Sequence, residues 1–165
     1  MIRRATAVAA LLALCAQPAR AQSVRSLGDY RDWSAYSASD GAGPVCFALS
    51  RPKDVSPTPD GFTEAYLYLT HRPSESVRNE INLVAGFTFA PDTPATLTIS
   101  GTSYDLFTEG DAAWLLNPDQ NDDLAGTIRA GSTLTIEGTS SMGIRVVETY
   151  SLSGATAASR AIESC

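Results

Sequence analysis

The chain has 165 residues, with 12 Lys or Arg against 18 Asp or Glu, so its net charge at neutral pH is −6. From Arg25 to Arg160 the basic residues are scattered singly, and no stripe of them can neutralise successive phosphates. This pattern argues against binding to nucleic acid or to an anionic membrane surface.

The N-terminus has the three parts of a signal peptide. A basic start over residues 1–4 precedes an apolar run over residues 5–16 and a small-x-small site at 19–21. We therefore expect residues 1–21 to be a signal peptide cut after Ala21, and residues 22–165 to form a single domain. The general secretory route is favoured over a lipoprotein signal at Cys15, where the bulky Leu14 precedes the cysteine, and over a twin-arginine signal, whose flanking pattern is missing.

Cleavage would leave no segment long enough to cross a membrane. The apolar run is about a dozen residues, whereas a bilayer needs about 20, and no later segment is longer or as apolar. The mature chain would carry nine basic side chains against 18 acidic ones, a net charge of about −9. This acidity favours solubility.

The mature chain has two cysteines, Cys46 and Cys165. An even cysteine count in an exported protein predicts a disulfide bond, because oxidising compartments form and keep such bonds. Two unpaired thiols are the less favoured alternative. The bridge would close a loop of 120 residues and tie the C-terminus to an early strand.

Short runs of β-branched and aromatic residues, separated by Gly, Pro, Asn, Asp and Ser, dominate the rest of the chain. This rhythm predicts an all-β fold, and about eight short strands suit a β-sandwich. The predicted strands are residues 32–38, 44–50, 65–71, 80–89, 95–100, 103–108, 132–139 and 144–151.

Two of these runs alternate clearly between apolar and polar residues. Leu97 and Ile99 face one way, Leu134 and Ile136 repeat the pattern, and we expect all four in the core. Ser100-Gly101 predicts a tight hairpin, because glycine supplies the positive φ that a two-residue turn needs.

The remaining segments predict loops and two short helices. Residues 51–61 are polar and hold three prolines, which predicts an extended, exposed loop, and residues 140–143 predict another. Asp122-Asp123 at the start and Gly131 at the end predict a brief helix. The alanine-rich segment 154–162 predicts a short C-terminal helix that delivers Cys165.

No catalytic, cofactor-binding or metal-binding residues are predicted. His71 is the single histidine, there is no G-x-S-x-G elbow, and both mature cysteines are assigned to the bridge. An ordinary, partly exposed histidine is favoured over a general base and over a structural hydrogen bond at this position. Zinc lacks sufficient ligands, since one histidine and no free thiol remain.

Residues 119–123 place oxygen ligands as the start of a calcium loop does. The sixth position is Leu124 instead of glycine, and the twelfth is Ala130 instead of glutamate. Helix capping is therefore favoured over irregular calcium binding. Carboxylate pairs such as Glu109 with Asp111 leave a hydrolase open, but only their distance in space is diagnostic.

The aromatic residues are interpreted first as packing residues of the fold. Trp33 and Trp114 lie among apolar or strand-forming neighbours and are predicted to anchor the core. Tyr66 and Tyr68 alternate on one face of a strand. Packing within the sandwich is their default role, and on an open face they would form a patch suited to protein or glycan contact.

Several features follow one another along the chain: Trp33, Cys46, Arg72-Pro73, Gly86-Phe87, Ala113-Trp114, Gly131, the run from Glu148 to Gly154 and Cys165. In this order they resemble the invasion-associated locus B family of bacterial exported proteins, and the resemblance covers nearly the whole mature chain. It implies an immunoglobulin-like β-sandwich in an alphaproteobacterial envelope protein without enzyme activity.

These observations predict an exported, non-enzymatic interaction protein of the periplasm or outer surface. The resemblance implies a contribution to host-cell invasion or adhesion, and we expect an unknown protein or glycan partner at the cell envelope. The contact loops would be residues 51–61 and 117–123. The alternatives are a periplasmic factor that supports envelope integrity and, less favoured, a periplasmic hydrolase using His71 or paired carboxylates.

Overall fold

The fold is that of a computed structural model in which residues 24–39 and 41–165 are described. The predicted signal peptide and its cleavage site at Ala21 lie outside the described residues. Among the residues that are described, no helix is long and apolar enough to cross a membrane.

The all-β prediction is confirmed. Antiparallel strands form one sheet in the order β1-β2-β3-β5-β6-β9-β8-β7-β10-β11-β4. The strands are β1 (Arg25–Tyr30), β2 (Trp33–Ser39), β3 (Pro44–Ser50), β4 (Asp54–Ser56), β5 (Tyr66–Arg72), β6 (Val77–Val84), β7 (Ala95–Ile99), β8 (Thr102–Glu109), β9 (Ala112–Leu115), β10 (Thr133–Thr139) and β11 (Arg145–Ser151), and the helices are the 3-10 turns η1 (Pro73–Glu75) and η2 (Pro118–Gln120) with α1 (Asn121–Ala130) and α2 (Ala155–Ile162).

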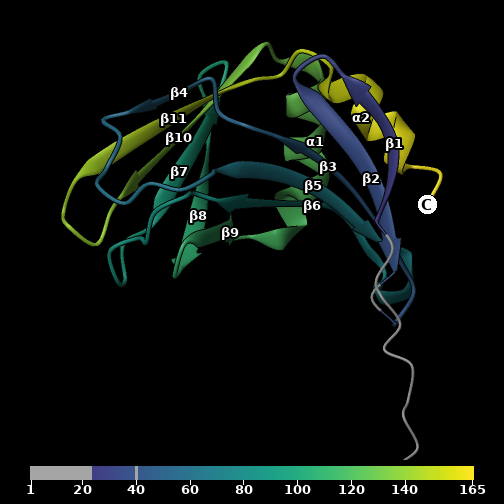
Figure 1. The fold of residues 1–165 in the computed structure, drawn as a ribbon, viewed down its shortest axis with the longest axis horizontal. Coiled ribbons are helices and arrows are strands. Elements are labelled where there is room, and N and C mark those ends of the chain that lie inside the picture. The colour runs from purple at the N-terminus through teal and green to yellow at the C-terminus, as the bar shows by residue number, and fades with distance from the viewer. Residues whose placement is uncertain (1–23, 40) are drawn as a thin grey trace, which may run out of the picture.

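The sheet bends into an arch, so that its two halves and the helices enclose one core as a β-sandwich (Figure 1). A hydrogen bond joins two strands that are distant in sheet order. The indole N–H of Trp33 on β2 donates to the carbonyl of Ser151 on β11 (3.0 Å). The predicted core positions are confirmed, since Leu97, Ile99, Leu134 and Ile136 are all buried.

Eight of the strands match the predicted runs, and β1, β4 and β9 were not predicted. β1 is a polar edge strand with a bulge at Gly28, and β4 has three residues, so neither shows a regular alternation. β6 is shorter than the predicted run over 80–89, because the chain leaves the sheet before Gly86, whose φ is +71°.

The hairpin turn at Ser100-Gly101 agrees with the prediction, whereas the loop predicted over residues 51–61 differs from it. Ser100 and Gly101 both have positive φ (50° and 85°), which confirms the tight turn between β7 and β8. Residues 51–61 are not wholly an exposed loop. They contain β4, which pairs with β11, and Pro59 is buried.

Both helices occur where the sequence predicts them. Asp122 and Asp123 lie in the first turn of α1, and Tyr104 of β8 donates its hydroxyl hydrogen to Asp123 (2.8 Å). α2 begins after Gly154, whose φ is +99°. A Cβ at this position would lie 1.7 Å from the carbonyl oxygen of Tyr30, so the chain passes β1 here in a way that only glycine permits.

Candidate functional site

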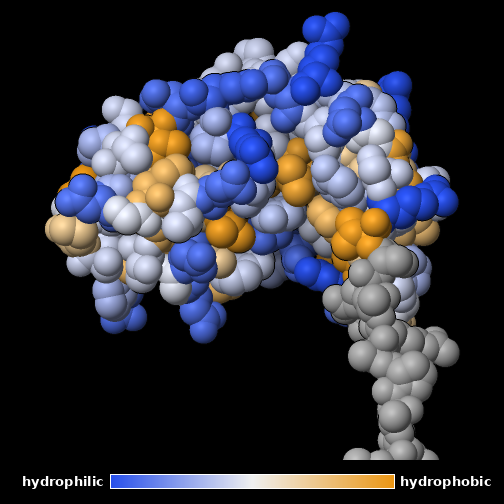
Figure 2. All heavy atoms as spheres, in the orientation of Figure 1, coloured by the Kyte–Doolittle hydropathy of each residue, from blue (hydrophilic) through white to orange (hydrophobic). Residues whose placement is uncertain are grey.

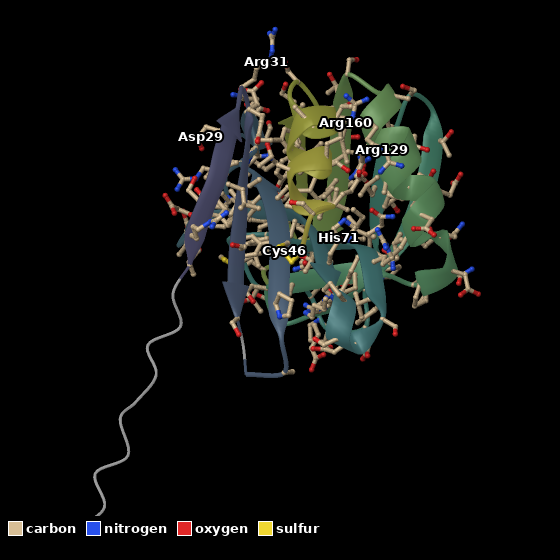
Figure 3. All side chains as sticks on the ribbon, turned by 90° about the vertical axis from the view of Figure 1, so that its right-hand side faces the viewer. Asp29, Arg31, Cys46, His71, Arg129 and Arg160 are labelled. Carbon is tan, nitrogen blue, oxygen red and sulfur yellow. A yellow bond between two sulfur atoms is a disulfide. The ribbon has the colours of Figure 1, made fainter. Side chains whose placement is uncertain are left out.

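Cys46 and Cys165 form a disulfide bond with a Cα–Cα distance of 5.8 Å. Cys46 is buried on β3, and α2 packs against β1, β2 and β3 before the chain reaches Cys165. Figure 3 shows Cys46 beside His71, which is its cross-strand partner on β5. The bond therefore holds the chain after α2 on the sheet.

His71 is more buried than the sequence predicted. Its side chain faces the core at 4% exposure, because its position on β5 continues the inward row of Leu67 and Leu69. The backbone N–H of Asn79 donates to His71 Nδ1 (3.2 Å), and Nε2 is buried without a partner among the described residues. Burial lowers the pKa of this histidine, and the nearby charge of Arg78 lowers it further. His71 is therefore a neutral structural residue.

Glu148 is the second buried titratable group. It faces the core from β11 at 1% exposure, opposite Ile136 of β10 and Val55 of β4. Tyr150 donates its hydroxyl hydrogen to Glu148 Oε2 (2.7 Å), while Oε1 has no hydrogen-bond partner within the described part of the chain. Burial raises the pKa of Glu148 to about 7, and the hydrogen bond from Tyr150 opposes part of that rise.

These groups do not form a catalytic arrangement. His71 lies on β5 and Glu148 on β11; Glu148 bonds the Tyr150 hydroxyl, and within the described residues neither group hydrogen-bonds to a Ser or Thr hydroxyl or to a second carboxylate. In residues 24–39 and 41–165, no group of three His, Cys, Asp or Glu side chains is placed to hold a metal ion. The acids at 119–123 serve the fold instead.

Polar side chains of the largely exposed loop at 117–123 bond to β6 and to the loop's own backbone. Asn121 Oδ1 accepts from the backbone N–H of Ile81 (3.1 Å), and Asp122 Oδ1 accepts from the side-chain amide of Asn79 (2.6 Å). Asn117 caps η2 by accepting from the backbone N–H of Asp119. These bonds fasten α1 to β6, so most of this loop's polar groups are already engaged.

A row of aromatic side chains lies on the face of the sheet that points away from the core. Cross-strand pairs place them together: Tyr36 lies opposite Phe47, and Asn82 of β6 lies between Tyr68 and Trp114. Each partner of such a pair points to the same side of a sheet. We call this surface the outer aromatic face, and its six rings are Tyr36 (β2), Phe47 (β3), Tyr66 and Tyr68 (β5), Trp114 (β9) and Phe107 (β8).

The rings contact one another in two groups. Tyr36 stacks on Phe47 with centroids 5.4 Å apart, and Phe47 continues to Tyr68 (6.1 Å) and Tyr66 (6.0 Å). Phe107 stacks on Trp114 (5.3 Å, interplanar angle 17°) across β8 and β9. Six adjacent strands at about 4.8 Å spacing give the surface a width of about 24 Å.

The other half of the sheet has a different outward surface. The outward positions of β7 and β10 are mainly threonines, and an ion pair between Glu137 and Arg145 joins β10 to β11. Outward-facing aromatic side chains are thus concentrated on the half of the sheet that runs from β2 to β8. Figure 2 shows the hydrophobic residues on the viewed side as separate patches between hydrophilic ones.

Trp33 is buried as predicted, but the prediction for Trp114 is wrong. Trp33 is 1% exposed, whereas Trp114 is only partly buried and lies on the outer aromatic face. Its neighbours Ala113 and Leu115 point into the core instead, because successive residues of a strand point to opposite sides. Tyr66 and Tyr68 share their face as the alternation predicts, and that face is open.

No model of a known protein family matches the sequence, and no curated protein matches it. The structure is similar to the crystal structure of invasion associated protein B from Bartonella henselae. The TM-score is 0.59, the match covers 85% of this chain and 96% of that chain, and the sequence identity is 15%. At this identity the similarity concerns the fold alone. The resemblance seen in the sequence is therefore confirmed at that level: the chain has the fold of invasion associated protein B.

Proposed function

We propose that this chain is an exported, non-enzymatic interaction protein whose outer aromatic face contacts a partner at the cell envelope. The observation that carries the proposal is the gathering of six rings on the outward side of five of the six adjacent strands from β2 to β8. Aromatic side chains are enriched at interfaces because each offers a large apolar area with few rotatable bonds. The same proposal includes a contribution of this contact to host-cell adhesion or invasion, which the resemblance implies.

The face is favoured over the two loops as the contact surface. Residues 51–61 include β4, which is held in the sheet, and Asn121 and Asp122 of the 117–123 loop are engaged in bonds to β6. The rings pack against each other and their strand neighbours, and Tyr66 also accepts a hydrogen bond from Arg51 (3.1 Å) and donates one to Glu64. Phe107 is 41% exposed, although removal of such a side chain from water lowers the free energy.

Export is tested on the protein purified from the producing bacterium. Cleavage of the predicted signal peptide gives a mature chain that begins at Gln22, which intact-mass measurement detects. Digestion by protease added to intact cells would place the contact at the outer surface, and protection would place it in the periplasm, where support of envelope integrity is the alternative role. A chain that still begins at Met1 in the cytoplasmic fraction would contradict the proposal.

The contact is tested with threonine variants of the face. Threonine favours strands and occupies the outward positions of the other half, so Phe47→Thr with Tyr68→Thr should keep the fold. We expect retention on isolated envelopes or on host cells to fall at least tenfold, which corresponds to about 1.4 kcal/mol. The matched control is Met142→Thr, because Met142 is 64% exposed on the turn between β10 and β11, away from the face.

Circular dichroism and thermal unfolding check that each variant is folded. Equal retention of the wild type and the face variant would contradict the proposed contact, and a loss with Met142→Thr would place the contact on the hairpin instead.

A further inference from the structure

A groove of about 290 Å³ lies at the β8–β9 end of the outer aromatic face. The stacked rings of Phe107 and Trp114 line it, and Pro118 of η2 and Asn121 of α1 line it from the helical side. Phe107 is the most exposed ring of the face. The groove is thus a shallow site with an aromatic wall, at the low end of the volumes that hold small ligands.

Polar groups at the rim of the groove are left to bind a ligand. Glu109 is exposed, and its carboxylate accepts no hydrogen bond from any described residue. Glu80 uses Oε1 to accept from Arg72 (2.8 Å), so Oε2 remains. Asn121 uses its Oδ1 for the backbone of β6, which leaves its side-chain NH₂ group as a donor. The rim therefore offers acceptors and a donor beside the rings.

The charge of the groove restricts the class of ligand. Its lining includes two carboxylates, Glu80 and Glu109, and no Lys or Arg. The whole chain also carries more acidic than basic side chains. An anionic ligand would be repelled, whereas hydroxyl and ammonium groups would be attracted.

We propose that this groove binds a neutral or cationic glycan of the hexosamine type. The aromatic faces carry negative potential, and the axial C–H groups of a pyranose ring carry positive potential, so the sugar ring stacks on Phe107 and Trp114. Its hydroxyl or amino hydrogens donate to the Glu109 and Glu80 carboxylates, and Asn121 donates to a sugar oxygen. The inference rests on the proposed function and names the chemistry of its partner.

Size favours a glycan over a protein at this groove. An α-helix with its side chains is about 10–12 Å wide, and a stable protein interface buries about 800 Å² on each partner. A groove of about 290 Å³ is too small to hold a helix or to supply such an interface. It is large enough for one sugar unit of a longer chain, whose other units run along the face.

The test is titration of the purified protein with three β-1,4- or α-1,4-linked tetrasaccharides that differ in charge: a glucosamine tetramer, an N-acetylglucosamine tetramer and a galacturonate tetramer. Trp114 lines the groove and is partly exposed, whereas Trp33 is buried, so a change in tryptophan fluorescence reports the groove. We expect saturable binding of the first two and none of the galacturonate tetramer.

Variants assign the binding to the groove. Binding by the variants is measured by isothermal titration calorimetry, because Trp114→Thr removes the fluorescent reporter. We expect Trp114→Thr to lower the affinity for both hexosamine tetramers at least tenfold, and Glu109→Gln to weaken the cationic tetramer more than the neutral one. Met142→Thr should bind as the wild type does. No saturable binding of either hexosamine tetramer by the wild type, or equal binding by Trp114→Thr, would overturn the glycan inference.

Envelope retention separates this inference from the proposed function. If Trp114→Thr loses retention but the wild type binds neither hexosamine tetramer, the face is correct and the hexosamine inference is wrong. If the hexosamines bind at the groove but retention is unchanged in Phe47→Thr/Tyr68→Thr, the groove is correct and the wider face is wrong.

Discussion

Removal of the disulfide, through Cys46→Ala together with Cys165→Ala, is expected to lower the free energy of unfolding by up to about 5 kcal/mol. The bond joins residues 119 positions apart, and closure of so long a loop restricts the unfolded chain strongly. α2 should loosen before the sheet, because the bond holds the end of the chain to β3 while α2 itself packs through four small or apolar residues, Ala155, Ala158, Ser159 and Ile162.

Urea unfolding of the variant and of the wild type, with and without reductant, measures this effect. Hydrogen exchange should rise first in α2 and later in β10 and β11. Reduced wild type should behave as the double variant does, which controls for the loss of the two side chains. Equal stability of all three forms would contradict the assigned role of the bond.

Glu148→Gln is expected to stabilise the protein by about 3 kcal/mol at pH 8 and to leave its stability nearly unchanged at pH 4.5. The carboxyl of Glu148 has a pKa near 4.5 when the chain is unfolded and about 7 when it is folded. Between these values the unfolded state loses its proton while the folded state keeps it. The contribution to stability is therefore complete below pH 4.5 and is lost as pH rises through 7, at about 1.4 kcal/mol per pH unit.

Glutamine suits this test because it is neutral and still accepts the hydrogen bond from Tyr150. The measurement is the difference in the free energy of urea unfolding between the variant and the wild type at pH 4.5, 6 and 8. His71 acts in the opposite direction, because its lowered pKa costs stability as pH falls below 6.5. His71 is present in both proteins, so its effect on stability cancels in the difference. A difference that does not change with pH would show that Glu148 does not titrate as the buried site requires.

Local sequence patterns predicted most of the fold. The alternation around Leu97 and Ile99 placed β7 and its inward face, and residues 44–50 match β3 at both ends. β9 was missed because Ala112–Leu115 is short and carries no regular alternation, so Trp114 was assigned to the core with its apolar neighbours. The pairing of Trp114 with Asn82 and Phe107 decides which side of the sheet it faces. The local sequence around Trp114 does not reveal these pairs.

The outer aromatic face could be predicted only in part for the same reason. Tyr66 and Tyr68 are two positions apart in one strand, so their shared face is visible in the sequence. Tyr36, Phe47 and Trp114 come from three other strands, and they become neighbours only because the sheet pairs β3 with β5 and β6 with β9. The burial of Glu148 likewise depends on β4, a short strand that forms by pairing with β11.

Oxidative footprinting of side chains, with and without saturating isolated envelope, tests the contact surface most directly. Exposed aromatic and methionine side chains both react, so Phe107 and Trp114 report the outer aromatic face and Met142 reports the β10–β11 hairpin in the same sample. The account predicts that bound envelope protects the face residues and leaves Met142 as reactive as before. Unchanged reactivity of the face, with protection at Met142 or in residues 51–61, would contradict it.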